Sequence, residues 1–130
     1  MAQQPFLVAP LQRAVVALKA ALSAPDDEFV RDSIVKRFEF TYEIAWKLMR
    51  RHLAWAALEA PPETRRDLFR ASARAGLIED PEAWFVFHEA RNLTSHTYNE
   101  AHATRVIATA RQFLPAAQFL LTELERRHGD

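Results

Sequence analysis

Residues 26–57 constrain the fold most, because this stretch contains neither proline nor glycine. Both residues disfavour a helix interior, so their absence favours one long helix. Asp26 and Asp27 suit its N-terminal end, where carboxylates stabilise the helix dipole. The apolar and aromatic residues of the stretch cover more than one helical face, which predicts a central helix enclosed by other helices. These residues are Val30, Ile34, Phe38, Phe40, Tyr42, Ile44, Ala45, Trp46, Leu48, Met49, Leu53 and Trp55.

Two shorter amphipathic segments flank the central stretch. Before it, apolar residues at steps of three and four predict a helix over residues 9–23, with Pro10 in its first turn. After it, two consecutive prolines break the chain. A helix is then expected over roughly residues 63–75, where Gly76 is well placed as the C-terminal cap.

The C-terminal part holds two further helices. An Asp-Pro pair at 80–81 combines an N-cap residue with proline at the first helical position. The helix that follows is rich in aromatic residues and leads into a polar run at 91–100. Asn99 can cap a last helix that reaches about residue 127 and that Pro115 should kink.

Five helices on short connections predict a single all-α domain over residues 1–130, an antiparallel four- to five-helix bundle. Two glycines are too few for the tight turns of an all-β protein or for a glycine-rich phosphate loop. Seventeen basic and seventeen acidic residues leave no net charge, so contact with nucleic acid would need a local patch. The absence of cysteine excludes disulfides, thiolate nucleophiles and cysteine metal sites.

The sequence shows no sign of export or of a membrane span. The N-terminal segment lacks a basic start, and Arg13 and Lys19 interrupt its apolar run, so we expect no signal peptide. No apolar run reaches the ~18–20 residues that a membrane span needs. We therefore expect a cytoplasmic protein that does not associate with membranes.

The run 91–98 stands out because it contains one aliphatic residue between two apolar helices. Phosphodiester cleavage needs a proton acceptor near neutral pH and a cation for the charge that develops on phosphorus. His96 and Arg91 are of these types, while Thr94 and Ser95 supply hydroxyls in supporting roles. The polar residues of the run include Arg91, Asn92, Thr94, Ser95, His96 and Tyr98.

The spacing of Arg91 and His96 carries a structural inference. On a regular helix the two residues lie ~140° apart, so they do not share a face. Either the helix distorts or two copies face each other. A twofold homodimer would form a composite site, because residue i of one copy can meet residue j of the other. The same residues are also typical of helix ends, where they satisfy backbone carbonyls or pair with acids such as Glu89 and Glu100.

Three segments resemble the nucleotidyltransferase substrate-binding protein family, a branch of the HEPN superfamily. They are RFEFTYEIAWKLMRRHL at 37–53, AGLI at 75–78 and RNLTSHTYNE at 91–100. The third segment contains the HEPN signature Arg-x4-His in its extended form, Arg-x4-His-x-Tyr. The resemblance implies a helical bundle that dimerises through the motif helices and is encoded beside a minimal nucleotidyltransferase.

The resemblance also implies a function for the motif. Relatives act as metal-independent endoribonuclease toxins, which a partner nucleotidyltransferase silences by transferring AMP to the motif tyrosine. By this resemblance Arg91 would stabilise the phosphorane, His96 would be the acid and base, and Asn92 would assist with hydrogen bonds. Tyr98 would accept AMP. The family's name implies an alternative, a non-catalytic subunit that presents substrate to the nucleotidyltransferase. RNA is a further candidate partner.

Other features have plainer interpretations. A basic stripe on the third helix could touch RNA phosphates or the partner enzyme, but helix surfaces carry such rows routinely. Aromatic residues of the central helix could stack bases, but core positions are expected for them. These sets are Arg66, Arg70 and Arg74, and Phe40, Trp46 and Trp55. His88 could border the motif or lie on the helix surface. No two of the five histidines are three or four residues apart, so we expect no metal site and no cofactor.

Overall fold

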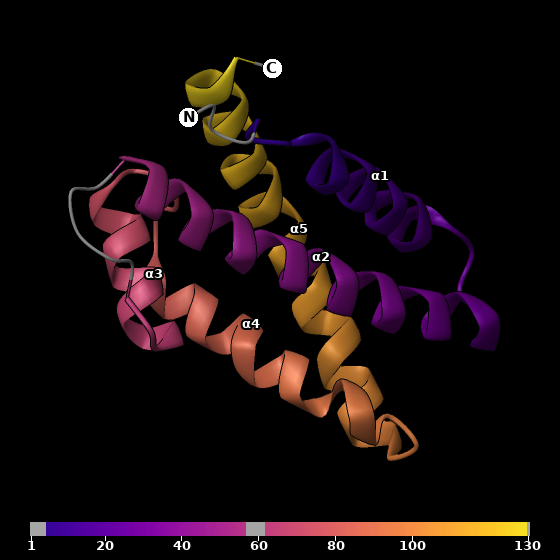
Figure 1. The fold of residues 1–130 in the computed structure, drawn as a ribbon. Helices are drawn as coiled ribbons and strands as arrows, with labels where there is room; N and C mark the ends of the chain where they lie inside the picture. The colour runs from indigo at the N-terminus through magenta and orange to yellow at the C-terminus, as the bar shows by residue number, and fades with distance from the viewer. Residues whose placement is uncertain (1–4, 57–61, 130) are drawn as a thin grey trace.

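The computed structural model describes residues 5–56 and 62–129, and within these ranges it contains helices and no strand. The predicted all-α bundle is confirmed. In Figure 1, α2 lies between α1 and α4, α5 crosses behind α2, and α3 sits beside the start of α4. The helices are α1 (Ala9–Ser23), α2 (Glu28–Ala56), α3 (Arg65–Arg74), α4 (Pro81–Leu93), the short 3-10 helix η1 (Thr94–His96) and α5 (Glu100–His128).

Helix ends follow the capping residues of the sequence. The Asp80 carboxylate accepts a hydrogen bond from the Glu82 backbone N–H at 2.9 Å, and Pro81 opens α4. Asn99 caps α5 in the same way, through the backbone N–H of Ala101 at 2.9 Å. Gly76 follows α3 at φ +78°, a conformation that favours glycine. These caps match the sequence-based predictions.

One predicted helix boundary differs from the structure, and another lies outside the described residues. The third helix begins two residues later than expected, because the Thr64 hydroxyl accepts from the Asp67 backbone N–H and makes Thr64 the N-cap. The expected end of the central helix, residue 57, lies outside the described residues. α5 continues through the exposed Pro115, and the kink there remains a prediction.

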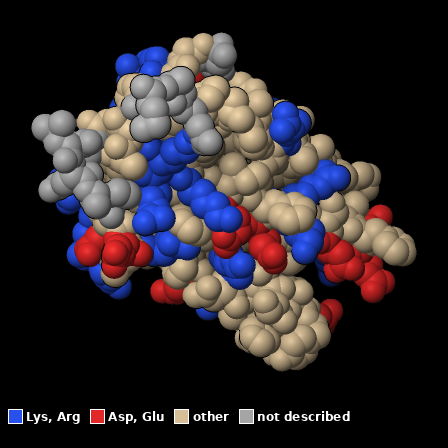
Figure 2. Space-filling view, viewed as in Figure 1, with Lys and Arg blue, Asp and Glu red and all other residues tan. Residues whose placement is uncertain are grey.

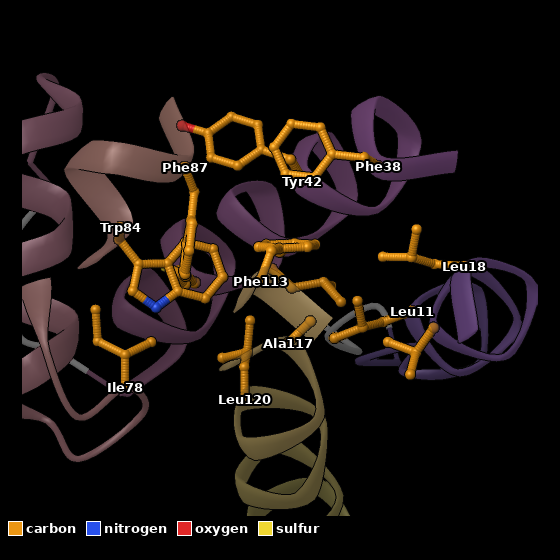
Figure 3. Packing of buried hydrophobic residues seen from close by; sticks show 14 of the residues in the cluster. Leu11, Leu18, Phe38, Tyr42, Ile78, Trp84, Phe87, Phe113, Ala117 and Leu120 are labelled. Atoms are coloured by element: carbon orange, nitrogen blue, oxygen red, sulfur yellow. The ribbon is translucent and has the colours of Figure 1, made fainter. Parts of the chain in front are cut away.

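The centre of the hydrophobic core is an aromatic cluster shared by α2, α4 and α5 (Figure 3). Phe113 of α5 makes edge-on contacts with Phe38 of α2 and with Phe87 of α4, each with ring centroids 5.1 Å apart. Trp84 packs against the same Phe113 ring at 5.5 Å. Edge-to-face pairs of this kind add ~0.5–1.5 kcal/mol each beyond their buried area. This packing fixes α4 against α2 and so sets the position of the polar residues beyond the core.

One expectation about the core is wrong. Phe40 and Trp55 are 54% and 52% exposed, although we expected both inside the bundle. The reason is that α2 is not enclosed on every side, so one of its faces remains in contact with solvent (Figure 1). The exposure of Trp46 is intermediate, because its ring packs partly against the core.

Candidate functional site

The motif lies where α4 ends. The α-helix stops at Leu93, and η1 carries the chain through Thr94 to His96. The buried Thr94 hydroxyl donates to the Arg91 carbonyl oxygen at 2.7 Å, a bond that stabilises this end of the helix. Arg91 and His96 therefore do not belong to one regular helix. Of the two alternatives left open by the sequence, the helix distortion occurs within a single chain.

Arg91 is held from the side by Glu43 of α2. Its Nε donates to Oε1 of Glu43 at 2.7 Å, and both side chains are about 30% exposed, at 30% and 29%. The other oxygen of Glu43 accepts from Trp46 Nε1 at 2.9 Å. Burial pushes the pKa of Glu43 upward, but the hydrogen bonds from Trp46 and Arg91 outweigh this effect and hold that pKa below its ordinary value. The Nη1 and Nη2 groups of Arg91 have no hydrogen-bond partner within the described chain.

A polar layer joins α2, α3 and α4 beside this pair. The Tyr42 hydroxyl and His88 Nδ1 are hydrogen-bonded at 2.7 Å. Burial raises the pKa of Tyr42 to about 12. Burial, followed by the positive charges of Arg65 and Arg91, lowers the pKa of His88. Both groups are therefore neutral at neutral pH, so neither adds a charge beside the ion pair of Arg91 and Glu43.

His96 and Tyr98 lie on the exposed side of the motif. Tyr98 is 85% exposed, and its hydroxyl is 3.4 Å from His96 Nδ1, with the two rings edge-on at 5.9 Å. The His96 carbonyl accepts from the Asn99 backbone N–H at 3.2 Å, which closes the turn before α5. His96 Nε2 has no hydrogen-bond partner among the described residues, so this nitrogen is free to exchange a proton with a ligand.

The remaining motif residues differ in position. Asn92 and Ser95 are exposed, and their side chains make no hydrogen bond with the described chain. Thr94 instead points inward and supports the helix end. No hydrogen bond or ring contact joins Arg91 to His96 in this part of the chain. A single chain thus gathers the six predicted residues at one end of the bundle without placing Arg91 in contact with His96.

Sequence reasoning missed Glu43, Tyr42 and Arg65. Glu43 lies in the segment that carried the family resemblance, three residues before Trp46, and this spacing puts both on one face of a helix. An acid beside aromatic residues on a largely apolar helix was the available signal. His88, considered as a border of the motif or a surface residue, is half-buried and contributes to the polar layer.

Two other kinds of feature are absent from residues 5–56 and 62–129. No three His, Asp or Glu side chains converge there as a group that could hold a metal ion. None of the helices in these ranges has both the length and the apolar character needed to cross a bilayer.

The family is settled by a match over nearly the whole chain. The pattern of the family described as nucleotidyltransferase substrate binding protein like matches residues 8–126. The chain belongs to this family. The matched residues include the long α2, the motif helix α4 and most of the final helix α5.

A curated relative agrees with this family assignment. A Haemophilus influenzae protein named "Probable ribonuclease HepT" is 36% identical over an alignment of 97 residues, which covers 72% of this chain and 66% of that protein. The match thus spans slightly less than two thirds of that relative's length.

Two solved structures share the family fold. One, from Haemophilus influenzae, is described as revealing the fold of a substrate binding domain of a nucleotidyltransferase. It has a TM-score of 0.84 and 28% identity, covering 92% of this chain and 99% of its own. A crystal structure from Thermus thermophilus has a TM-score of 0.79 and 25% identity, covering 88% of this chain and 98% of its own.

Proposed function

We propose that this chain is the HEPN component of a two-gene HEPN/minimal nucleotidyltransferase toxin–antitoxin pair. It acts as a metal-independent endoribonuclease in the form of a homodimer. Arg91 and His96 are the catalytic pair, and Asn92 assists them. The partner nucleotidyltransferase silences the enzyme by transferring AMP to Tyr98. The family match and the name of the Haemophilus influenzae relative support the ribonuclease assignment.

The observation that carries this proposal is the state of Arg91. Glu43 fixes its Nε, while Nη1 and Nη2 remain unpaired within the described chain. A guanidinium held on one edge and open on the other is suited to bind a phosphate with two parallel hydrogen bonds. The exposed His96 and Tyr98 follow at the same end of α4.

Cleavage without a metal uses the 2′-hydroxyl of the RNA as the nucleophile. His96 takes the 2′-hydroxyl proton, the 2′-oxygen bonds to phosphorus, and the bond from phosphorus to the 5′-oxygen breaks. The departing 5′-oxygen then takes that proton back from the His96 imidazolium, leaving a 2′,3′-cyclic phosphate and a 5′-hydroxyl. Arg91 Nη groups and the Asn92 amide stabilise the extra negative charge on the phosphorane oxygens.

The homodimer is proposed because the single chain leaves Arg91 and His96 without a mutual contact. Mixing the inactive variants Arg91→Ala and His96→Ala tests it. If each site combines residues from two copies, half of the randomly assorted dimers regain one of their two sites. RNA cleavage should then recover to about a quarter of the wild-type rate. If each site lies within one chain, the mixture stays as inactive as its components.

The catalytic assignment is tested on labelled RNA in the presence of a metal chelator. Removing a general acid and base typically costs ~10²–10⁴-fold, so His96→Ala should abolish most cleavage. His102→Gln is the matched control, because it retains a hydrogen-bond donor at the position whose Nδ1 lies 3.3 Å from the His96 carbonyl. A folded His96→Ala protein that cleaves as fast as the control would show that the assignment is wrong.

The regulatory assignment is tested by intact-mass spectrometry after incubation with the partner and ATP. The chain has only two tyrosines, and Tyr42 is 1% exposed whereas Tyr98 is 85% exposed. We expect added AMP units on the wild type and none on Tyr98→Phe. Modification that persists in Tyr98→Phe would place the AMP on another residue.

A second candidate function is a non-catalytic subunit that presents substrate to a nucleotidyltransferase. The description of the Haemophilus influenzae structure as a substrate binding domain favours it. Under this alternative the purified protein leaves RNA intact, binds the nucleotidyltransferase, and gains no AMP. The cleavage and mass assays above therefore distinguish the two functions.

A further inference from the structure

The charges of this neutral chain are unevenly distributed. Residues 44–78 contain seven Lys and Arg and three Asp and Glu, whereas the rest of the chain contains ten and fourteen. In the structure these cations come together from two helices. Figure 2 shows them over the C-terminal half of α2 and on α3, with acidic residues at the edge and toward the other end of α2. We name six of them the basic surface: Lys47, Arg50, Arg51, Arg65, Arg66 and Arg70.

The cations of the basic surface are not neutralised by the described chain. None of the six has a carboxylate oxygen within 4.0 Å among residues 5–56 and 62–129, although ion pairs form elsewhere. A shallow hollow lies among Lys47, Arg50 and Arg51, beside Trp46 and Ala54. Uncompensated positive charge around a hollow favours an anionic ligand.

Aromatic rings are interleaved with these cations. The Arg65 guanidinium lies 3.2 Å from the centroid of the Trp46 ring, and Lys47 Nζ lies 5.7 Å from the same ring. Arg66 and Arg70 both lie over Phe85, at 4.8 and 5.9 Å. Arginines stacked on aromatic rings are typical of surfaces that bind single-stranded nucleic acid, where the guanidinium edges meet phosphates and their outer planes can stack on bases.

The basic surface is continuous with the motif. Trp46 at its edge donates to Glu43, and Glu43 holds Arg91. From Glu43 to Arg51 the α2 axis runs ~12 Å at ~1.5 Å per residue, which is a few nucleotides of extended strand. A strand bound on the basic surface can therefore extend to Arg91 without leaving the same side of α2.

We propose that the basic surface binds the phosphate backbone of single-stranded RNA and guides it to Arg91. This inference rests on the proposed ribonuclease function and names the form of its substrate. The occupant is RNA and not an acidic protein, because guanidinium planes held over aromatic rings can themselves stack on bases and because the surface leads to a phosphate-binding arginine.

The test measures binding of a fluorescent, short, single-stranded 2′-O-methyl RNA by anisotropy over a range of salt concentrations. This probe lacks the nucleophilic hydroxyl, so it stays intact whether or not the protein cleaves RNA. Lys47→Gln with Arg50→Gln removes two charges from the basic surface. Arg13→Gln with Lys19→Gln removes two exposed, unbridged charges from α1 and is the matched control.

Each phosphate contact to a single strand contributes a slope of ~0.7 to the fall of log affinity with log salt. The Lys47/Arg50 double variant should therefore reduce that slope by about 1.4, while the control double variant keeps the wild-type slope. Equal slopes in the two double variants would overturn the inference. Wild-type binding of a polyglutamate peptide as tight as that of the RNA probe would also overturn it, because the surface would then suit an acidic partner.

Cleavage of unmodified RNA is measured separately, so failure of the ribonuclease proposal can be distinguished from failure of the basic-surface proposal. Binding with the expected slope change but without cleavage supports the basic surface and contradicts the ribonuclease. Cleavage with an unchanged slope supports the ribonuclease and contradicts the basic surface.

Discussion

The buried His52, which is hydrogen-bonded to the half-buried His128, makes the stability of this protein depend on pH. His52 is 3% exposed, and its Nδ1 lies 2.7 Å from Nε2 of His128. Phe6 stacks on the His128 ring at 3.6 Å, and so closes the pair from the N-terminal side. Burial, followed by the positive charges of His128 and Arg127, lowers the pKa of His52 to about 4. The native state thus requires a neutral imidazole at this position.

The sign of the effect follows from where the proton binds. The unfolded chain takes up a proton at His52 near its ordinary pKa of 6.5, whereas the native chain does so only near 4. The stability that depends on a neutral His52 is therefore fully present above pH ~6.5 and is lost as the pH falls toward ~4. At ~1.4 kcal/mol per pKa unit, His52 alone should cost about 2 kcal/mol of unfolding free energy between pH ~7.5 and pH ~5.

Urea denaturation followed by tryptophan fluorescence at these two pH values measures the loss. The wild type should lose at least ~2 kcal/mol, because His128 and His88 also have lowered pKa values. His52→Gln keeps a polar partner for His128 but removes the titrating group, so its loss should be about 2 kcal/mol smaller. His96→Gln changes an exposed histidine and serves as the control. Equal losses in wild type and His52→Gln would refute the reasoning.

Three further predictions concern the core, a cap and the site. Trp84→Ala should lower the unfolding free energy by ~3–5 kcal/mol, measured in urea, because it removes a ring packed among other aromatic rings. Asn99→Ala should cost ~1 kcal/mol in the same assay, because the α5 cap is lost; no change would mean that the cap is redundant. Glu43→Gln should lower kcat for RNA cleavage ~10–100-fold with little change in KM, because Arg91 loses its fixed direction. Recovery of kcat in Glu43→Asp would show that orientation, and not folding, is affected.

The helix ends could be read from the sequence because capping is local chemistry. Asp80 and Asn99 bind backbone groups two or three residues away, and Gly76 adopts its positive φ within its own turn. Such interactions need no knowledge of the rest of the fold. The motif residues were also visible, because a polar run between apolar helices is a local contrast.

The partners of the motif were not visible because they depend on tertiary packing. Glu43 meets Arg91 across 48 positions of sequence, and Tyr42 meets His88 across 46. The sequence did not predict where α4 ends either, because no residue near Leu93 breaks a helix as proline does. The exposure of Phe40 and Trp55 has a similar origin, since apolarity indicates burial only on average.

The carboxylate that Arg91 and Trp46 share has a practical consequence. A phosphate bound to the open edge of the guanidinium adds negative charge close to Glu43, and the indole bound to the same carboxylate then changes its surroundings. Of the other tryptophans, Trp84 is buried in the core and Trp55 lies further along α2, near its C-terminal end. The fluorescence emission of Trp46 should therefore report ligand binding at the motif and at the adjoining basic surface, without any added label.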